Sequence, residues 1–358
     1  MSTPDTPHPI LFIPGPVEVD PELRALMAMP LVGHRSQGFK ATVQGLLPKL
    51  QRLFRTQAHA LFENAPATAL MEAAIRNLVG ARVLHLTNGA FSERWAKISE
   101  ACGRQPQTLA VAWGEVVTPE KLRAELRGTQ PFEAVCITHS ETSTGALSPL
   151  RELAQVVHEE QPDALVLVDA VTSLAGTKLE FDAWGVDCAF AGTQKALALP
   201  PGLCVFAVSE RAMAKAKTVP GRGFLFDFPR AADSLAKGET LATPCVPLVF
   251  ALSRQLDRIE LETLDARWQR HAAMQTETAA WCAAHDFSYF VADGFRSPTV
   301  STVNASGRVV TELIAKAKAA GFTLSNGYGK LKDQTFRIGH MGDHDVTRLR
   351  ALLAALAG

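Results

Sequence analysis

Short apolar runs alternate with longer amphipathic runs along the chain from about residue 60 to residue 250. Short apolar runs in this region predict strands, and the longer amphipathic runs between them predict helices. Several short runs are apolar at odd and even positions alike, which is typical of strands covered on both faces. The predicted strands are Val83–Leu86, Thr108–Val111, Ala134–Thr138, Leu165–Val168, Cys188–Ala191 and Cys204–Val208.

Amphipathic runs lie between most of these strands, as at Ser92–Cys102, Pro119–Leu126 and Arg151–Glu160. A chain that repeats strand, helix, strand in this order forms right-handed crossovers between parallel strands. The pattern therefore predicts an α/β fold, with a mostly parallel central sheet and helices on both of its faces.

The pattern changes after about residue 250. A long helical stretch, Phe250 to about Ala284, leads into shorter mixed elements that predict a smaller α+β domain. These elements are strands near Thr299–Val303, Phe322–Leu324 and Thr335–Ile338, and helices at Val309–Ala320 and Val346–Ala357. Because 358 residues are too many for one minimal domain, we expect an N-terminal segment (1–18), a large domain (19–250) and a small C-terminal domain (251–358).

The charges of the chain balance, with 36 Lys+Arg against 36 Asp+Glu. Such a chain has no global field that would attract nucleic acid or an anionic membrane, so we expect neither as a partner. The N-terminus has no basic region and only a short apolar run, Ile10–Ile13, which predicts no signal peptide. No segment approaches the ~20 apolar residues of a membrane helix.

Six cysteines are scattered along the chain without a Cys-x-x-Cys pair. Three of them, Cys136, Cys188 and Cys204, lie in apolar strand-like runs, where cysteine behaves as a small buried hydrophobe. We therefore expect neither a disulfide framework nor a metal site, and a cytoplasmic location fits best.

Residues that could bind a ligand or take part in catalysis follow several predicted strands. The residues that come just after an apolar run are Asn88-Gly89-Ala90-Phe91, His139-Ser140-Glu141-Thr142-Ser143, Asp169 and Lys195. In open α/β sheets ligands bind beyond the carboxyl ends of the strands. We therefore expect an aromatic ring, a group of hydroxyls, an acid and a lysine to meet along one edge.

Lys195 and Asp169 are the strongest pair among these residues. Partial burial lowers the pKa of a lysine and makes its amine a nucleophile, as a Schiff base requires, although most lysines simply extend to water. A carboxylate such as Asp169 forms an ion pair with a pyridine nitrogen in some sites, and caps a helix or binds a metal in others. The two residues stand 26 positions apart at successive strand ends, which favours a functional pair.

Three further positions have both a functional and an ordinary interpretation. Ala67 and Thr68 precede an apolar helical pattern, where a helix N-terminus binds phosphate, but many ordinary helices begin in this way. Phe91 would stack on a flat heterocycle or pack in the core. Arg337, on a mostly apolar strand, would bind a carboxylate through two hydrogen bonds or form an intramolecular salt bridge.

Taken together, these residues resemble the class V aminotransferases, a family of fold-type I enzymes that depend on pyridoxal 5'-phosphate (PLP). Within that family the chain is most similar to the alanine/serine–glyoxylate (or pyruvate) aminotransferases. The resemblance covers nearly the whole chain, and its most specific motifs are Asp169-Ala170-Val171-Thr172-Ser173, Gln194-Lys195-Ala196-Leu197 and Pro200-Pro201-Gly202. Weaker motifs are Pro14-Gly15-Pro16, Gly33-His34-Arg35-Ser36, Met71-Glu72-Ala73-Ala74, Asn88-Gly89, Glu141-Thr142-Ser143-Thr144-Gly145 and Phe336-Arg337-Ile338-Gly339.

The resemblance implies how this chain would hold PLP. Lys195 would form the Schiff base and then move the proton between the substrate and the cofactor, and Asp169 would hold the pyridine nitrogen. The other contacts would come from Phe91 stacked on the ring, Thr142 at the ring hydroxyl, and Ala67, Thr68 and Gln194 at the phosphate.

The resemblance also implies a homodimer with a shared active site. Thr240 and Thr243 would reach the phosphate of the neighbouring subunit, and Arg337, helped by the backbone at Gly15, would bind the substrate carboxylate. The expected reaction moves an amino group from a small amino acid of the alanine or serine type to a small 2-oxo acid such as glyoxylate or pyruvate.

The chain departs from the family pattern in two places. Relatives usually have Ser- or Gly-rich residues where this chain has Ala65-Pro66-Ala67, and proline offers the phosphate no N–H group. Phe91 presents a smaller surface than the tryptophan of many relatives. Both departures predict a modest affinity for the cofactor.

Other functions on the same fold stay open. His34-Arg35 resembles the contact that phosphoserine aminotransferases make to the substrate phosphate, which makes Arg35 a candidate substrate-binding residue, but the ending Arg337–Gly342 favours the glyoxylate branch. A lyase or cysteine desulfurase needs a mobile cysteine loop, for which only Cys245 and Cys282 are placed late enough. A non-catalytic accessory subunit is the remaining alternative.

Overall fold

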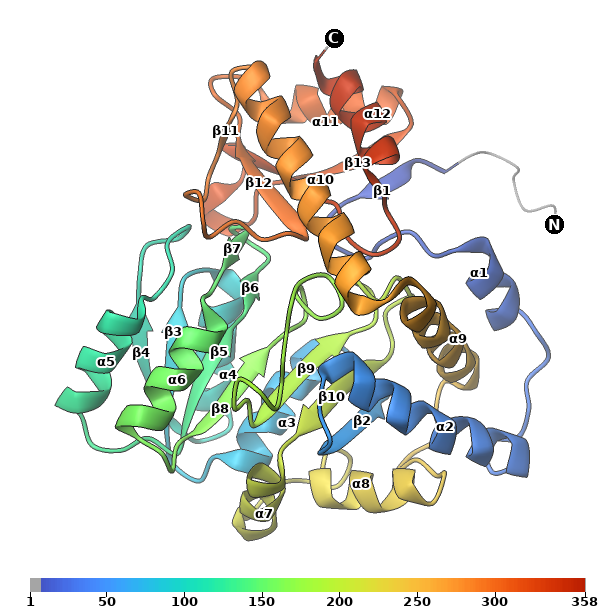
Figure 1. Cartoon of the computed structure of the whole chain (residues 1–358), viewed down its shortest axis with the longest axis vertical. Helices are drawn as coiled ribbons and strands as arrows, with labels where there is room; N and C mark the ends of the chain where they lie inside the picture. Colours follow the sequence, from blue (N-terminus) through green and yellow to red (C-terminus); the bar gives the residue numbers. More distant parts are fainter. Residues whose placement is uncertain (1–7, 358) are drawn as a thin grey trace.

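The computed structural model describes residues 8–357, so the first seven residues of the predicted N-terminal segment lie outside the described part. The chain forms a large sheet with its helices and, beside it, a smaller sheet with its own helices (Figure 1). The large sheet contains β2 (His59–Glu63), β3 (Arg82–Thr87), β4 (Gln105–Ala110), β5 (Ala134–Thr138), β8 (Leu165–Asp169), β9 (Cys188–Gly192) and β10 (Cys204–Val208).

The strands of the large sheet follow the order β2-β10-β9-β8-β5-β3-β4. All neighbouring pairs are parallel except those of β10, which runs antiparallel to both β2 and β9. Every residue of β5, β8, β9 and β10 is buried, as expected of strands covered on both faces. The prediction of a mostly parallel α/β sheet is therefore confirmed, while β2 was not predicted.

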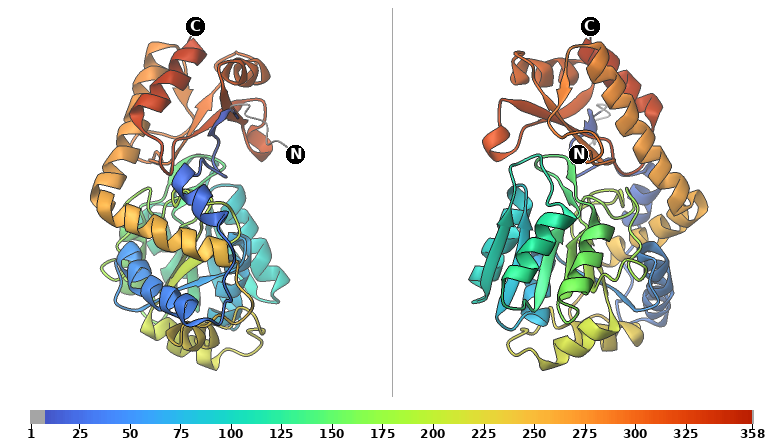
Figure 2. Two further views of the ribbon diagram at one scale, coloured as in Figure 1. Left: turned by 90° about the vertical axis from the view of Figure 1, so that its right-hand side faces the viewer. Right: turned by 60° about the vertical axis from the view of Figure 1, so that its left-hand side comes forward.

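Helices cover both faces of the large sheet. Views from several sides place α5 and α6 on one face and α3 and α4 on the other (Figure 2). The helices of this part are α1 (Pro21–Met27), α2 (Gln37–Phe54), α3 (Ala67–Leu78), α4 (Ala90–Ala101), α5 (Pro119–Gly128), α6 (Leu150–Glu160), α7 (Glu210–Thr218) and α8 (Phe228–Ala236). A short hairpin of β6 (Ser140–Glu141) and β7 (Ala146–Leu147) follows β5.

The small sheet has the order β1-β13-β14-β12-β11. Its first strand comes from the N-terminal segment and pairs in parallel with β13, more than 300 residues later in the chain. The elements are β1 (Ile10–Phe12), β11 (Ser288–Tyr289), β12 (Val300–Asn304), β13 (Phe322–Asn326), β14 (Thr335–Gly339), α11 (Val310–Ala319), the 3₁₀-helix η1 (Gly329–Leu331) and α12 (Val346–Ala357).

The long helix predicted from Phe250 to Ala284 is in fact two helices, α9 (Val246–Glu262) and α10 (Leu264–Ala284). The prediction of one helix is wrong at Thr263, whose φ of 70° is rare for a β-branched residue and ends the regular helix. The Thr263 hydroxyl accepts a hydrogen bond from the N–H of Ala266 and so caps α10. The break allows α9 to pack on α1 and α2 while α10 packs on α12.

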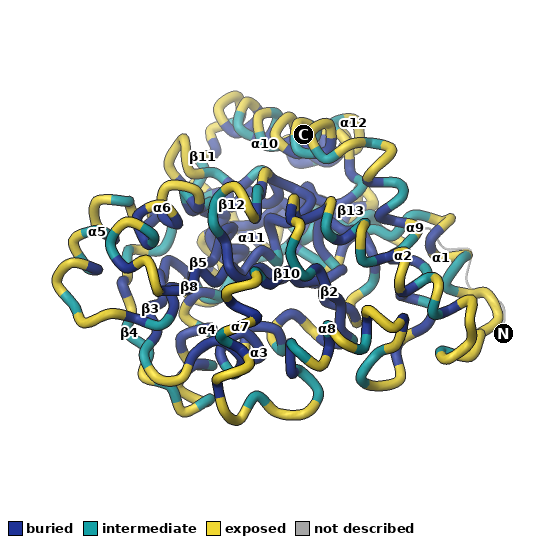
Figure 3. Tube along the Cα trace, turned by 60° about the horizontal axis from the view of Figure 1, so that its bottom comes forward, coloured by how far each residue is buried: buried dark blue, intermediate teal, exposed yellow. Residues whose placement is uncertain are grey.

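Burial follows this division, with the most buried segments at the strands of both sheets and exposed segments on the outer helices (Figure 3). The large sheet and its helices share one apolar core, and the small sheet packs with α10, α11 and α12 around a second. Phe12 of β1 is fully buried in the second core. Among residues 8–357, no helix combines the length and the apolar character that a membrane span requires.

Candidate active site

A cavity of about 310 Å³ opens beyond the carboxyl ends of β8 and β9, where the loop after β1 passes over the large sheet. It unites most of the predicted cofactor residues. Its lining is Gly15, Pro16, Pro66, Ala67, Thr68, Met71, Phe91, Arg94, Thr142, Asp169, Val171, Gln194, Lys195 and Pro201.

Lys195 lies three residues after β9 and is buried. Its Nζ donates to the carbonyl of Pro14, which brings the amine under the loop after β1. Burial and, to a lesser extent, the nearby Arg337 lower the pKa of Lys195 to about 8, while Asp169 acts in the opposite direction. An amine with this pKa is partly neutral near physiological pH and is therefore a competent nucleophile.

Gly15 makes this approach possible. Its φ is +98°, a conformation that favours glycine, and a Cβ atom there would lie 2.8 Å from Cδ of Lys195. Any larger residue would therefore displace the lysine side chain.

Asp169 is the last residue of β8 and is buried. One carboxylate oxygen accepts a hydrogen bond of 2.9 Å from the N–H of Val171, so the residue caps the turn that follows the strand. Burial raises the pKa of Asp169 to about 7, and this hydrogen bond opposes the shift. Within the described chain, no cationic side chain forms an ion pair with Asp169, so a cation from outside the chain would complete the site.

Glu141 fixes the start of α4, on which Phe91 stands. Its carboxylate accepts hydrogen bonds from the N–H groups of Phe91 (3.1 Å) and Ser92 (2.9 Å). It also accepts from the hydroxyls of Ser92 and Ser143. Gly89 leaves room for this contact, because a Cβ atom there would lie 2.3 Å from Cγ of Glu141.

The sequence did not predict this role for Glu141, although the residue begins the motif Glu141-Thr142-Ser143-Thr144-Gly145. The available signal was an acid placed after a buried strand, where it can meet the N-terminus of a neighbouring helix. That helix could not be identified from the sequence, because α4 and Glu141 are about 50 residues apart.

The first turn of α3 forms the side of the cavity where the sequence predicts the phosphate. Pro66 is the N-cap residue and provides no side-chain cap, so Ala67 and Thr68 begin the helix facing the cavity. The backbone N–H groups at a helix N-terminus attract anions. Thr142 is the residue predicted to contact the hydroxyl of the PLP ring. Its own hydroxyl lies 2.5 Å from that of Thr172.

Arg337 adjoins the cavity from β14 of the small sheet. Its Nε donates to the carbonyl of Asn326 (3.1 Å) and its Nη1 to the carbonyl of Thr142 (3.3 Å). Burial lowers the pKa of Arg337 to about 10. None of the described carboxylates pairs with it, so the intramolecular salt bridge that the sequence left open is not formed.

Three predicted residues do not line this cavity within the same chain. Arg35, Thr240 and Thr243 line a separate hollow of about 470 Å³ with His34 and Glu239. The Thr240 hydroxyl donates to the carbonyl of Ala242 in its own loop. A single chain therefore does not bring these three side chains to Lys195.

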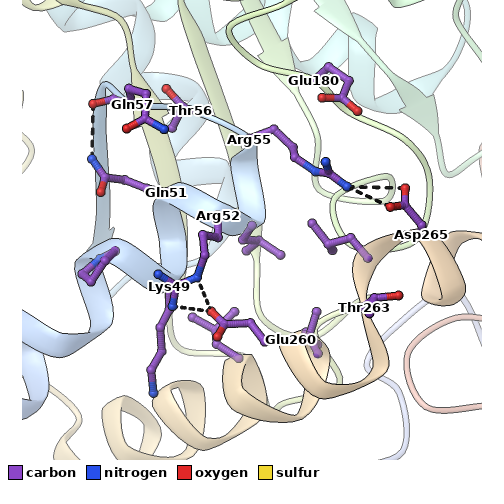
Figure 4. Close-up of a pocket in the computed structure, with 15 residues that line it drawn as sticks. Lys49, Gln51, Arg52, Arg55, Thr56, Gln57, Glu180, Glu260, Thr263 and Asp265 are labelled. Atoms are coloured by element: carbon purple, nitrogen blue, oxygen red, sulfur yellow. Dashed lines mark hydrogen bonds and ion pairs between the residues drawn. The ribbon is translucent and has the colours of Figure 1, made fainter.

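A larger hollow, of about 780 Å³, lies between α2 and the junction of α9 and α10, and is called the helix groove below (Figure 4). Its cations are already paired. Arg52 contacts Glu260 at 2.7 Å and Arg55 contacts Asp265 at 3.3 Å. Lys49 contacts Asp257 at 2.5 Å. These pairs hold α2 against α9 and α10, and the helix groove offers no free reactive group.

The residues around Lys195 fit PLP. The cavity offers an amine, a buried carboxylate for the pyridine nitrogen, an aromatic ring, a hydroxyl and a helix N-terminus for the phosphate. On a sheet of this topology, that set defines a fold-type I PLP enzyme.

Comparison with known proteins gives the family. Residues 63–316 match the family model described as aminotransferase class-V, and the chain belongs to this family. It is 35% identical over 360 residues to a protein named soluble hydrogenase, small subunit, from Synechococcus sp., covering 97% of this chain and 93% of the relative. It is 30% identical over 368 residues to a serine–glyoxylate aminotransferase of Methylorubrum extorquens, covering 97% and 89%.

A solved structure extends the comparison to the whole fold. The alanine–glyoxylate aminotransferase of Nostoc sp. superposes with a TM-score of 0.93 at 29% identity, covering 100% of this chain and 97% of that one. The chain is therefore a class V, PLP-dependent aminotransferase, as the sequence predicted. Its family membership implies PLP as the cofactor.

Proposed function

We propose that this enzyme moves an amino group from a small amino acid of the alanine or serine type to a small 2-oxo acid such as glyoxylate or pyruvate. The observation that carries the proposal is the Lys195 amine, with its lowered pKa, in one cavity with Asp169 and next to Arg337. The names of the serine–glyoxylate and alanine–glyoxylate aminotransferases support this substrate pair.

Bound PLP supplies the electron sink that stabilises negative charge at the substrate α-carbon. Lys195 would hold the cofactor through its Nζ, and the same amine, when free, would take the proton from the substrate α-carbon. Asp169 would hold the pyridine nitrogen and favour its protonated form through its negative charge. Phe91 would stack on the ring, Thr142 would contact the ring hydroxyl, and Ala67, Thr68 and Gln194 would hold the phosphate.

Arg337 binds the α-carboxylate that amino acids and 2-oxo acids share. A guanidinium can grip a carboxylate with two parallel hydrogen bonds, which also fixes its orientation. The backbone at Gly15, which lines the same cavity, would assist. This role requires an arginine that no carboxylate of the protein already occupies. Within residues 8–357, the hydrogen bonds of the Arg337 guanidinium go to backbone carbonyls alone.

We also propose a homodimer in which Thr240 and Thr243 bind the phosphate of the neighbouring subunit, and Arg35 approaches the neighbour's substrate. Two observations support it. Arg35, Thr240 and Thr243 share one surface hollow away from their own Lys195. Met29 and Leu31 on the preceding loop are 61% and 75% exposed, an apolar surface suited to burial against a second copy.

The reaction belongs, on this proposal, in the reducing cytoplasm. All six cysteines are free, four of them are buried, and none lines the cavity around Lys195. The absence of a cysteine from that cavity also disfavours cysteine desulfurization, because that reaction requires a cysteine thiol of the enzyme next to the sulfur of the substrate.

A half-reaction screen tests the function. The purified enzyme with PLP is mixed with single amino acids, and conversion of the cofactor to its pyridoxamine form is followed by absorbance. We expect alanine or serine to convert it fastest, and glyoxylate or pyruvate to reverse the change. If none of the amino acids converts the cofactor, the proposed function is wrong and the accessory-subunit hypothesis gains.

A further inference from the structure

Tyr328 connects the two parts of the molecule above the cavity. It precedes η1, in the loop that joins β13 to β14 of the small sheet. Its hydroxyl accepts a hydrogen bond of 3.1 Å from Nη2 of Arg94, which belongs to α4 beside the large sheet. Its ring lies 5.4 Å from the ring of Phe91, with 33° between the two planes.

The same ring covers Arg337. The guanidinium carbon of Arg337 lies 5.4 Å from the centroid of Tyr328, within the range of a cation–π contact. The hydrogen bonds of Arg337 to the carbonyls of Asn326 and Thr142 fix its Nε and Nη1. The Tyr328 ring lies against the face of this guanidinium. Tyr328 therefore contacts both Phe91, the aromatic residue of the proposed cofactor site, and Arg337, the proposed carboxylate-binding residue.

Arg94 holds Tyr328 in this place. It lines the cavity, and its guanidinium carbon lies 4.7 Å from the centroid of Phe91. In the described range it has no carboxylate partner. Its guanidinium is placed by one aromatic face and by the Tyr328 hydroxyl, so removal of that hydroxyl would leave the two side chains held only by their aromatic contacts.

We propose that Tyr328, held by Arg94, is a positioning residue that fixes the Arg337 guanidinium relative to Phe91 and so orients the substrate carboxylate over the cofactor. This inference rests on the proposed roles of Arg337 and Phe91. Tyr328 is only half-buried and belongs to neither apolar core, so its effect on catalysis is separable from folding.

The experiment compares the kinetics of Tyr328→Phe with those of the wild type in the amino-acid half-reaction. The variant keeps the ring and loses the acceptor for Arg94. We expect the KM for the amino acid to rise roughly five- to tenfold, the order expected for the loss of one ordinary hydrogen bond, with cofactor absorbance and affinity unchanged. Tyr328→Ala, which also removes the ring, should have a larger effect.

A double-mutant cycle separates positioning from general damage. In an Arg337→Ala background, Tyr328→Phe should cause no further loss, because its effect acts through Arg337. The matched control is Tyr289→Phe, since Tyr289 is the only other tyrosine and its hydroxyl contacts Ser301 and Gln275, residues that do not line the cavity. That variant should lower thermal stability and leave the KM unchanged.

The outcomes distinguish this inference from the proposed function. A wild-type KM in Tyr328→Phe, or losses that add fully in the double variant, would overturn the positioning role while the aminotransferase assignment stands. If the wild-type enzyme reacts with no amino acid at all, the proposed function and this inference both fail.

Discussion

The cavity around Lys195 and the helix groove differ in how their charges are matched. In the helix groove, which has more than twice the volume, Lys49, Arg52 and Arg55 each meet a carboxylate. Around Lys195 the buried charges of the described chain have no such partners, and burial shifts the pKa values of Lys195 and Asp169 toward neutrality. Unmatched buried charge, rather than volume, marks the site where a ligand belongs.

The largest expected effect follows from removal of the central amine. Lys195→Ala should lower the single-turnover rate with alanine by at least about 10²–10⁴-fold, the range for a lost general acid–base catalyst. Lys49→Ala, in the helix groove, is the matched control and should leave that rate unchanged. Comparable losses in the two lysine variants would remove the distinction between the two regions.

The second effect concerns the substrate carboxylate. Arg337→Ala should lower kcat/KM by about 2–5 kcal/mol, as for the loss of one partner of a buried charge pair, while the bound cofactor keeps its absorbance. Arg52→Ala should change activity not at all and stability by at most about 1 kcal/mol, because its ion pair is exposed. Wild-type kcat/KM in Arg337→Ala, measured with several amino acids, would contradict the assignment.

A third prediction concerns stability without cofactor. The pKa of Lys195 is lowered from 10.5 to about 8, so the unfolded chain binds this proton more tightly than the folded one. Burial of the charged lysine therefore lowers the free energy of unfolding below about pH 8, and this loss disappears as the pH rises toward 10.5. Lys195→Met should stabilise the cofactor-free protein by about 3–3.5 kcal/mol at pH 7, since one pKa unit corresponds to about 1.4 kcal/mol.

Urea denaturation at pH 7 and at pH 10.5 measures this difference. The gap between Lys195→Met and the wild type should close at the higher pH. A gap that stays constant with pH would mean that the lysine is not buried in charged form at neutral pH. Asp169 has the opposite sign, because its raised pKa makes stability fall as the pH rises from about 4 to about 7.

The smallest expected effect tests the shared site. Thr243→Ala should weaken PLP retention by about three- to tenfold through the loss of one hydrogen bond to the phosphate, while the dimer stays intact in sedimentation. Thr276→Ala, on the exposed side of α10, is the control and should retain PLP normally. A fully active, PLP-saturated monomer would rule out the shared site.

The parts of the molecule that were predictable are those with local signals. Buried strands such as Leu165–Asp169 appear as continuous apolar runs, and the residues that end them, including Asp169, could be assigned to one edge by topology alone. The break at Thr263 had no glycine or proline to announce it, so two helices read as one.

Long-range partners were not predictable from the sequence. The pairing of β1 with β13 joins residues more than 300 positions apart. Glu141 at the start of α4 and Arg94 on Tyr328 likewise depend on contacts between distant segments. Each of these side chains reads as an ordinary surface or motif residue until the fold brings its partner to it.

The most direct test of the central claim is to locate the cofactor on the chain. PLP is added to the purified enzyme, borohydride is used to make its attachment permanent, and the labelled peptide is identified by mass spectrometry. We expect a single labelled peptide that contains Lys195, and no label in the Lys195→Ala variant. Labelling at another residue, such as Lys49 in the helix groove, would contradict the account.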